Sequence, residues 1–321
     1  MVFAASRMLG RVIVAVACAA AVNALPARAA NAPTPGLIVF LGDSITYRGL
    51  YIAYAEACLR AAGDARPREF LNLGLSSETT SGLSEPGHAG GRFPRPDVFE
   101  RLGRVLAATK PQTVFACYGM NDGIYLELSP ERFMRFQQGI QRLRRDVEAS
   151  GAAIVHLTPP VYETAQAKQP AAGYAAVLDR YSAWLNSQGA AHGWQVLDVH
   201  QALLDFKAQR LRREPGFAYS RDGVHPADTG HWLMARVVLG HLAPALDVSR
   251  YDDATSAVSA LHPRGADVLR LVVQRQEVLR DAWLSSTGHQ RPGIAPGLPL
   301  PEANTRAAEL DRQLQDLLRT K

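Results

Sequence analysis

The sequence predicts an α/β protein in which a parallel sheet of about five strands is covered by helices on both faces. Short runs rich in β-branched and aromatic residues alternate along the chain with longer segments of helical periodicity. Several of these runs are apolar throughout, as in Leu37-Ile38-Val39-Phe40-Leu41, which is typical of strands buried on both faces. About five strands are too few for an eight-stranded barrel, so an open three-layer α/β/α sheet is favoured.

The elements follow one another in the order that such a sheet requires. Strands are expected at the apolar runs 37–41, 69–73, 113–118, 153–157 and 195–199. Helices are expected where apolar residues recur with helical spacing, at 51–62, 98–108, 130–150, 174–191 and 229–242. Gly63 is a typical helix end, and Ser129 before Pro130 is a typical helix start. In such sheets a ligand site lies beyond the carboxyl ends of the strands.

The first thirty residues differ from the rest of the chain. Arg7 and Arg11 precede an apolar run at 12–22, and an Ala27-Arg28-Ala29 site follows. This pattern predicts a cleaved secretory signal peptide over residues 1–29, since the run is shorter than the ~20 residues of a spanning helix. An uncleaved anchor and a lipoprotein lipidated at Cys18 are the alternatives. We therefore expect an exported protein, periplasmic or extracellular, with no integral membrane segment after the signal is removed.

Charge and cysteine content exclude other classes of function. Removing residues 1–29 takes away three arginines and no acidic residue, which lowers the formal net charge from +5 to +2. The basic character comes partly from the export signal, and nucleic-acid binding gains no support. Cys58 and Cys117 are expected to be buried free thiols, with a disulfide as the alternative. No clustered His/Cys pattern suggests a metal site, and no cofactor is expected.

The last part of the chain predicts a helical extension. A long amphipathic helix is expected at 254–286, broken near His262-Pro263, and another helix at 302–319. The predicted organisation is therefore a signal peptide at 1–29, an α/β domain at 35–245 and a C-terminal helical extension at 249–321. The extension is expected to pack on the main domain, to act as a lid, or to form a homo-oligomer.

Polar residues follow the predicted strands, and another polar group lies near the end of the domain. These groups are Gly42-Asp43-Ser44, Asn72-Leu73-Gly74, Gly119-Met120-Asn121-Asp122 and Asp222-Gly223-Val224-His225-Pro226. Each group alone is also typical of a turn or a helix cap. Their occurrence together, and the convergence of parallel strands at one sheet edge, favours a hydrolase site.

The chemistry of these residues predicts their roles. The Ser44 hydroxyl needs a base to become a nucleophile, and His225 is the candidate base. Asp222 lies three residues earlier and is expected to orient and stabilise the imidazole. The backbone N–H groups of Ser44 and Gly74, with the side-chain amide of Asn121, are the candidate oxyanion donors.

The sequence resembles the SGNH, or GDSL-type, hydrolase family over about residues 37–240. The four residues that name the family match Ser44, Gly74, Asn121 and His225. The resemblance implies a flavodoxin-like sheet, a shallow accessible site and no metal. Ser77 stands where members often carry a second glycine, and little effect on catalysis is expected because Gly74 is taken as the donor. The Gly-x-Ser-x-Gly elbow of ordinary α/β-hydrolases is absent around Ser44.

Four further residues are candidates for substrate binding. Asp43 and Asp122 adjoin the predicted catalytic residues, and His88 and Arg92 lie in the long polar loop after Gly74.

Within the family, export and the polar loop favour an esterase that removes O-acetyl groups from carbohydrate, by analogy. A general short-chain esterase or lysophospholipase, and a periplasmic O-acetyltransferase, are the alternative enzymes. A non-catalytic glycan-binding protein is the alternative of another class.

Overall fold

The computed structural model describes residues 1, 36–66, 68–168 and 171–319. Apart from Met1, the predicted signal peptide and Cys18 lie outside the described residues. A parallel five-stranded sheet lies at the centre, with the strand order β2-β1-β3-β4-β5. The strands are β1 Gly36–Gly42, β2 Arg68–Asn72, β3 Thr113–Cys117, β4 Ala153–Leu157 and β5 Gln195–Leu197. The predicted three-layer α/β fold is thus confirmed.

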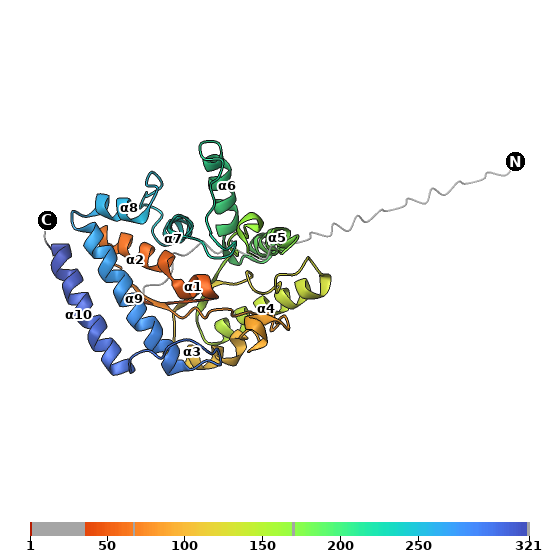
Figure 1. Cartoon of the computed structure of the whole chain (residues 1–321), viewed down its shortest axis with the longest axis horizontal. Helices are drawn as coiled ribbons and strands as arrows, with labels where there is room; N and C mark the ends of the chain where they lie inside the picture. Colours follow the sequence, from red (N-terminus) through yellow and green to blue (C-terminus); the bar gives the residue numbers. More distant parts are fainter. Residues whose placement is uncertain (2–35, 67, 169–170, 320–321) are drawn as a thin grey trace. The chain divides into compact units, whose positions relative to one another are not determined.

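Helices cover both faces of the sheet (Figure 1). The helices of the sheet domain are α1 Ser44–Arg48, α2 Leu50–Ala61, α3 Leu102–Thr109, α4 Pro130–Ala149, α5 Tyr174–His192, α6 Val199–Leu211 and α7 Asp228–Leu242. One face presents Phe40 and Phe115, whose rings contact Tyr51 of α2 and His241 of α7. The opposite face presents His156, which stacks on Trp194 beside α4 and α5. The apolar strands are therefore buried on both sides, as their composition predicts.

Three short 3₁₀ turns complete the sheet domain. They are His88–Gly91, Val98–Glu100 and Thr164–Gln166. The helix expected at 98–108 is split into the second of these turns and α3, because Arg101 between them leaves regular helix geometry and buries its guanidinium. Ser129 caps α4 by accepting a hydrogen bond from the N–H of Arg132, as predicted.

The end of the sheet differs from the prediction. The strand expected at 195–199 ends at Leu197, and the next helix, α6, is absent from the expected elements. Asp198 explains both differences, since its carboxylate accepts a hydrogen bond from the N–H of Gln201 and starts α6.

The C-terminal extension consists of helices packed on the edge of the sheet domain. They are α8 Ala254–Leu261, α9 Gly265–Thr287 and α10 Leu300–Arg319. The break near His262-Pro263 is confirmed. Figure 1 shows α9 lying between α2 and α10, and α9 also contacts β2. Within the described part of the chain, no helix is long and apolar enough to cross a membrane.

Candidate functional site

The serine lies at a tight turn between β1 and α1. Asp43 caps α1, because its Oδ1 accepts a hydrogen bond from the N–H of Ile45 at 2.9 Å. Ser44 is the first helical residue, so its own N–H points out of the helix start with no acceptor among the described residues. Gly42 has no room for a side chain, since a Cβ there would lie 2.2 Å from Oγ1 of Thr46. The turn therefore exposes both the hydroxyl and the backbone N–H of Ser44 at the sheet edge.

A chain of hydrogen bonds joins Ser44, His225 and Asp222. His225 Nε2 lies 2.8 Å from Ser44 Oγ, and Nδ1 lies 2.7 Å from Asp222 Oδ2. Asp222 Oδ1 accepts the backbone N–H groups of Val224 and His225 at 3.0 and 2.9 Å. Burial alone would raise the pKa of Asp222, but these bonds and the imidazole hold it below its usual value. The carboxylate is thus ionised and accepts Nδ1–H, which leaves the lone pair of Nε2 facing the serine.

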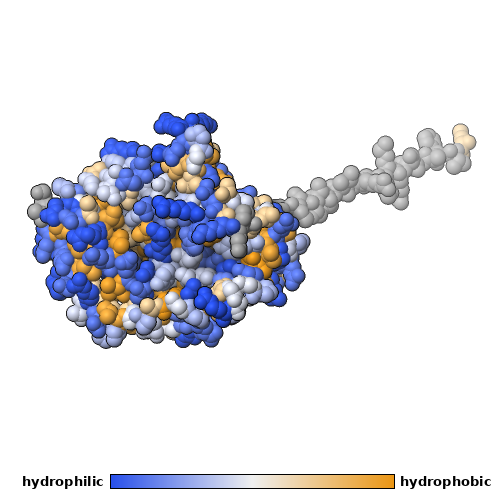
Figure 2. Space-filling model, viewed as in Figure 1, coloured by the Kyte–Doolittle hydropathy of each residue, from blue (hydrophilic) through white to orange (hydrophobic). Residues whose placement is uncertain are grey.

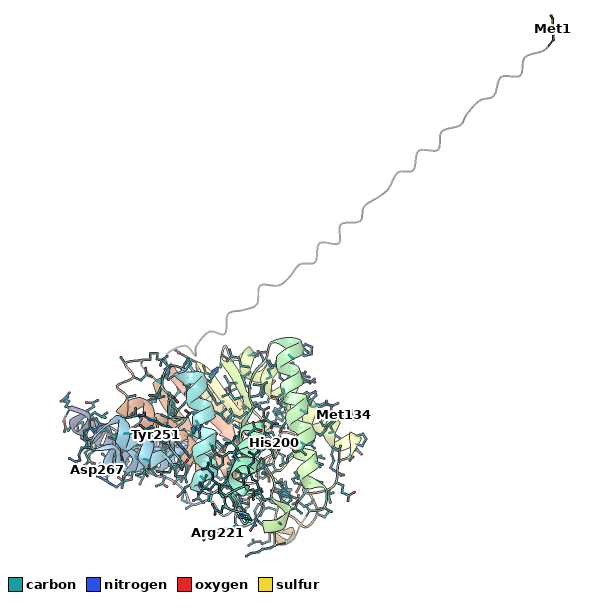
Figure 3. The ribbon with its side chains drawn as sticks, turned by 90° about the horizontal axis from the view of Figure 1, so that it is seen from above. Met1, Met134, His200, Arg221, Tyr251 and Asp267 are labelled. Carbon is teal, nitrogen blue, oxygen red and sulfur yellow. The ribbon has the colours of Figure 1, made fainter. Side chains whose placement is uncertain are left out.

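The site formed by Ser44, His225 and Asp222 is open to solvent. The side chains of His225 and Asp222 are 41% and 46% exposed. Figure 3 shows the neighbouring Arg221 at the outer edge of the described part of the chain. A substrate can therefore reach the serine without the movement of a cover, in line with the shallow site that the resemblance implies.

The loop that carries His225 is hydrogen-bonded to a buried residue that the sequence did not single out. Glu163 is 5% exposed, and its Oε2 accepts both the N–H and the hydroxyl of Ser220, at 2.7 and 2.9 Å. The N–H of Glu163 donates to the carbonyl of Gly223 at 2.8 Å. Gly223 has a φ of +83°, and a Cβ there would lie 2.9 Å from the Glu163 carbonyl. Glu163 therefore fixes the approach of His225 to the serine.

Gly74, expected as an oxyanion donor, has its N–H in a hydrogen bond within the protein. Its N–H already donates to Oδ1 of Asn72 at 2.9 Å. A Cβ at Gly74 would lie 2.3 Å from the backbone N of Tyr47, so the residue allows the loop to pass against α1. Ser77 adopts a φ of +69°, which favours glycine, and its N–H meets no acceptor among the described residues. Gly74 thus lets the loop pack against α1, and its role as an oxyanion donor stays a prediction.

Asn121 and Asp122 follow β3 and meet the loop after β2. The Nδ2 of Asn121 donates to the carbonyl of Glu78 at 3.3 Å, and its second amide hydrogen has no acceptor among the described residues. The buried Asp122 accepts three hydrogen bonds at Oδ1, from the N–H and hydroxyl of Thr80 and from the N–H of Ser81. Asp122 therefore ties the two loops together.

Neither aspartate expected to bind substrate is free to do so. Asp122 is fully buried in the contacts just described, and Asp43 is 2% exposed beneath the start of α1. Burial also raises the pKa of Asp43 to about 7, so this carboxyl is only partly ionised near neutral pH. Both residues support the backbone around the serine.

A buried ion pair underlies the same loops. Arg101 donates to both carboxylate oxygens of Glu78, at 2.6 and 2.7 Å, and to the carbonyl of Leu73 at 2.7 Å. The hydroxyl of Tyr118 donates to Glu78 at 2.6 Å. Since Glu78 also holds Asn121 through its carbonyl, this network connects the segments after β2 and β3.

The long loop after Gly74 places Arg92, but not His88, in the lining of a separate hollow. Residues 84–86 and 91–94 line a volume of 330 Å³. His88 is largely buried, with Nδ1 3.5 Å from Glu85 and its ring edge against Phe93. Arg92 is exposed and donates to the carbonyl of Ala89 at 2.8 Å. Neither residue hydrogen-bonds to Ser44 within the described part of the chain, so their role in substrate binding stays a prediction.

The C-terminal extension reaches the helix that carries the serine. Arg280 of α9 donates to the carbonyl of Tyr47 at 3.0 Å and lies over the Tyr47 ring at 4.3 Å. Asn72 donates to the same carbonyl at 3.2 Å. The extension thus supports α1 from the side of α2 and β2, while its roles as a lid or in a homo-oligomer stay predictions.

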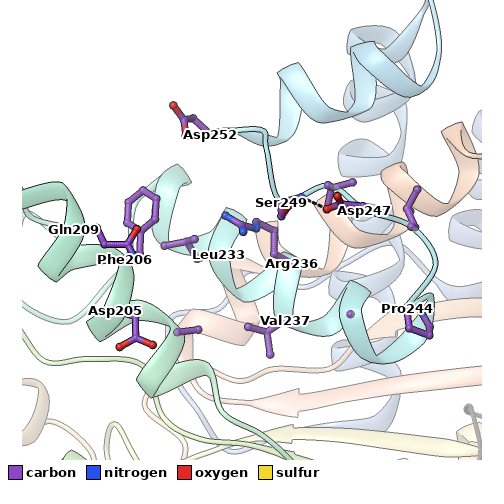
Figure 4. A pocket seen from close by; sticks show the side chains of 14 residues that line it. Asp205, Phe206, Gln209, Leu233, Arg236, Val237, Pro244, Asp247, Ser249 and Asp252 are labelled. Atoms are coloured by element: carbon purple, nitrogen blue, oxygen red, sulfur yellow. Dashed lines mark hydrogen bonds between the residues drawn. The ribbon is translucent and has the colours of Figure 1, made fainter.

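A larger hollow lies away from the serine. It measures 670 Å³ and lies between α6, α7 and the segment 244–252 (Figure 4). Ser44, Asp222 and His225 are not among the residues that line it.

The described residues contain no group of three or more His, Cys, Asp or Glu side chains that could hold a metal ion. Cys58 and Cys117 are buried free thiols, as expected.

The fold and the hydrogen-bonded serine, histidine and aspartate define a class of protein, the α/β hydrolytic enzymes with a serine site at the sheet edge. Residues 40–233, more than half of the chain, match the GDSL-like lipase/acylhydrolase family. The chain belongs to this family, and is therefore a carboxylic ester hydrolase.

Solved structures share the fold at low sequence identity. A gut microbial diltiazem-metabolizing enzyme matches with a TM-score of 0.51 and 20% identity, over 64% of this chain and 46% of that one. An acetylxylan esterase from Geobacillus stearothermophilus matches with a TM-score of 0.50 and 19% identity, over 65% and 96% of the two chains. A mutant of that enzyme, described as an acetyl-xylooligosaccharide esterase, matches with a TM-score of 0.50 and 18% identity, over 68% of this chain and 99% of that one. No curated protein matches the chain significantly.

Proposed function

We propose that this ester hydrolase uses Ser44 as its nucleophile and removes O-acetyl groups from carbohydrate outside the cytoplasm. The observation that carries the catalytic part is the hydrogen-bonded chain from Asp222 through His225 to the Ser44 hydroxyl. In this arrangement the base, its orienting acid and the nucleophile are in place before substrate arrives.

The reaction follows from these contacts. The Ser44 oxygen attacks the ester carbonyl while His225 Nε2 takes the hydroxyl proton, and the ionised Asp222 stabilises the imidazolium. The proton then passes to the departing alcohol oxygen, which leaves an acyl group on the serine. Water attacks this acyl-enzyme with His225 again as base, and the carboxylic acid is released.

The negative charge on the attacked oxygen needs fixed donors. The free N–H of Ser44 and the second amide hydrogen of Asn121 are the donors that we assign. We expect Asn121→Ala to lower kcat about 10²–10³-fold with KM nearly unchanged, since such donors act mainly in the transition state. Steady-state kinetics of the variant measure this, and an unchanged kcat contradicts the assignment.

Three observations support a carbohydrate acetyl ester as the substrate. The site around Ser44 is open to solvent, which suits an acetyl group attached to a bulky polymer. The loop after Gly74 is polar and glycine-rich, and offers no long apolar cover for a lipid chain. The acetylxylan esterase whose fold this chain shares carries such a substrate in its name. Export, as the predicted signal peptide indicates, would place the enzyme among envelope or extracellular glycans.

Three exposed apolar side chains favour a second candidate, an esterase for longer acyl chains. Leu126 and Leu128 follow Asn121 by a few residues and are 47% and 49% exposed, and Met134 of α4 is 47% exposed. Figure 2 shows hydrophobic side chains interspersed among hydrophilic ones on the face that it presents. Exposed leucines that follow Asn121 in the sequence would favour an ester with an apolar chain.

Hydrolysis of p-nitrophenyl esters from acetate to octanoate distinguishes the two candidates. The mature protein is compared with Ser44→Ala and with Ser187→Ala, a control serine on α5 that donates to the carbonyl of Trp184. We expect turnover to fall beyond acetate, to vanish in Ser44→Ala and to persist in the control. Turnover that rises with chain length would instead favour the second candidate.

Acetylated xylan tests the substrate directly. Release of acetate that depends on Ser44 supports the proposal, whereas transfer of acetyl groups to an added sugar would indicate an acyltransferase. A glycan-binding protein without activity would bind the polymer, release nothing, and remain unlabelled by a fluorophosphonate probe of the serine.

A further inference from the structure

The amide of Asn121 is held at both of its ends. Its Oδ1 accepts one hydrogen bond from Arg95 Nη1 at 2.9 Å and another from the Tyr125 hydroxyl at 3.1 Å. Its Nδ2 donates to the carbonyl of Glu78 at 3.3 Å. Only one hydrogen of the amide therefore remains for a ligand.

Arg95 is itself fixed in place. Its side chain is 6% exposed, and two guanidinium nitrogens bond both oxygens of Glu85, at 2.7 and 2.6 Å. The guanidinium also lies over the Tyr125 ring at 5.1 Å. The backbone N–H of Arg95 donates to the hydroxyl of Ser84 at 2.9 Å. Burial and these pairings leave the guanidinium one direction for its remaining contact, toward Asn121.

These contacts determine which way round the amide lies. If the amide were reversed, its NH₂ group would lie against a cationic guanidinium and its oxygen against the Glu78 carbonyl. Both contacts would be repulsive. A cation on Oδ1 also draws electron density from the amide and makes the N–H groups stronger donors. Asn121 would otherwise be free to reverse at little cost, since its two ends are nearly equal in shape.

We propose that Arg95 is a positioning residue for ester hydrolysis, which orients and polarises the Asn121 amide so that its free N–H stabilises the oxyanion. This inference rests on the proposed function, in which Asn121 is an oxyanion donor. It assigns a role in ester hydrolysis to the loop after Gly74, through the contact between Arg95 and Asn121.

Arg95→Met tests the inference by removing the charge and the hydrogen bond while keeping a long side chain. We expect kcat to fall about 10- to 10²-fold, less than in Asn121→Ala, with KM changed less than about twofold. Arg95→Lys should recover part of the loss, because it restores the positive charge without the two-pronged geometry. Arg144→Met is the matched control, since Arg144 also pairs with a carboxylate, Glu148, and lies over an aromatic ring, that of Trp194, at 4.9 Å.

A double-mutant cycle separates this role from one of holding the loop. If Arg95 acts through the amide, Arg95→Met should have no further effect on kcat once Asn121 is alanine. An equal loss of kcat in both backgrounds, or a loss confined to KM, would overturn the proposal. If Arg95→Met does not fold, Tyr125→Phe is a second test of the proposal, because it removes the other donor to Asn121 Oδ1 and keeps the ring. In that case we expect a smaller fall in kcat, again absent without Asn121, and an unchanged kcat would overturn the proposal.

The two proposals fail in different ways. If Ser44→Ala retains activity, the proposed function itself is wrong. If Ser44→Ala is inactive while the Arg95 variants match the wild type, the proposed function stands and only the role of Arg95 is refuted.

Discussion

Acid should destabilise this protein through His156, a buried imidazole without hydrogen-bond partners. His156 lies on β4 at 1% exposure, and neither ring nitrogen has a partner among the described residues. Its ring stacks on Trp194 at 5.3 Å. Burial lowers the pKa of His156 from 6.5 to about 3, because the charged form would lose its water. We expect His156→Leu to remove this acid sensitivity.

The size of the loss of stability in acid follows from the lowered pKa of His156. Below pH 6.5 the unfolded chain takes up a proton at His156, while the folded chain does not until about pH 3. Stability is therefore lost as the pH falls through this window, and is unaffected above it. At pH 5, about 1.5 pKa units below 6.5, the loss amounts to about 2 kcal/mol. At pH 7.5 the imidazole is neutral in both states and the loss is close to zero.

Urea unfolding of wild type and His156→Leu at pH 7.5 and pH 5 measures the effect. The free energy of unfolding of the variant, relative to wild type, should rise by about 2 kcal/mol between the two pH values. His192→Gln provides a control on the exposed end of α5 and should show no such rise. If the difference between wild type and His156→Leu is the same at both pH values, the reasoning is refuted.

The remaining predictions concern the support of the site and the two cysteines. Arg101→Leu should lower the free energy of unfolding by about 3–5 kcal/mol in urea titrations, because it leaves the carboxylate of Glu78 buried and unpaired. Replacing Glu78 by leucine as well should recover much of this loss, and no recovery would contradict the argument. Ser77→Gly should raise the free energy of unfolding by up to about 1 kcal/mol, since glycine adopts the φ of +69° without strain, and a lowered melting temperature would contradict this. Cys58 and Cys117 should react with a thiol reagent only after denaturation, and fast reaction of the native protein would show that they are accessible.

Much of the sheet and the grouping of the serine with the histidine could be predicted from the sequence. Continuous apolar runs have few structures open to them other than buried parallel strands, and the carboxyl ends of such strands meet at one edge. Ser44 and Asn121 follow adjacent strands, β1 and β3, so their proximity follows from the topology. The spacing of Asp222 and His225 permits the contact that the structure has.

The rest depends on side-chain contacts between distant segments, which leave no local pattern. Arg95 lies 26 residues before its partner Asn121, in a loop without periodicity, and Glu163 lies 57 residues before Ser220. Whether the Gly74 N–H is hydrogen-bonded depends on the rotamer of Asn72, which a resemblance between sequences does not reveal. Arg95 and Glu163 could not be singled out from the sequence, because their contacts are set by the packing of distant segments.

The contact between Arg280 and Tyr47 has a consequence for when the protein can become active. Arg280 is made more than two hundred residues after Tyr47, the residue of α1 that it contacts. During synthesis, this contact therefore cannot form until α9 has been made. A chain that is still emerging, or that has lost its C-terminal helices to a protease, would carry Ser44 on an incompletely supported helix. The helix that carries the serine thus depends on a segment more than two hundred residues further along the chain.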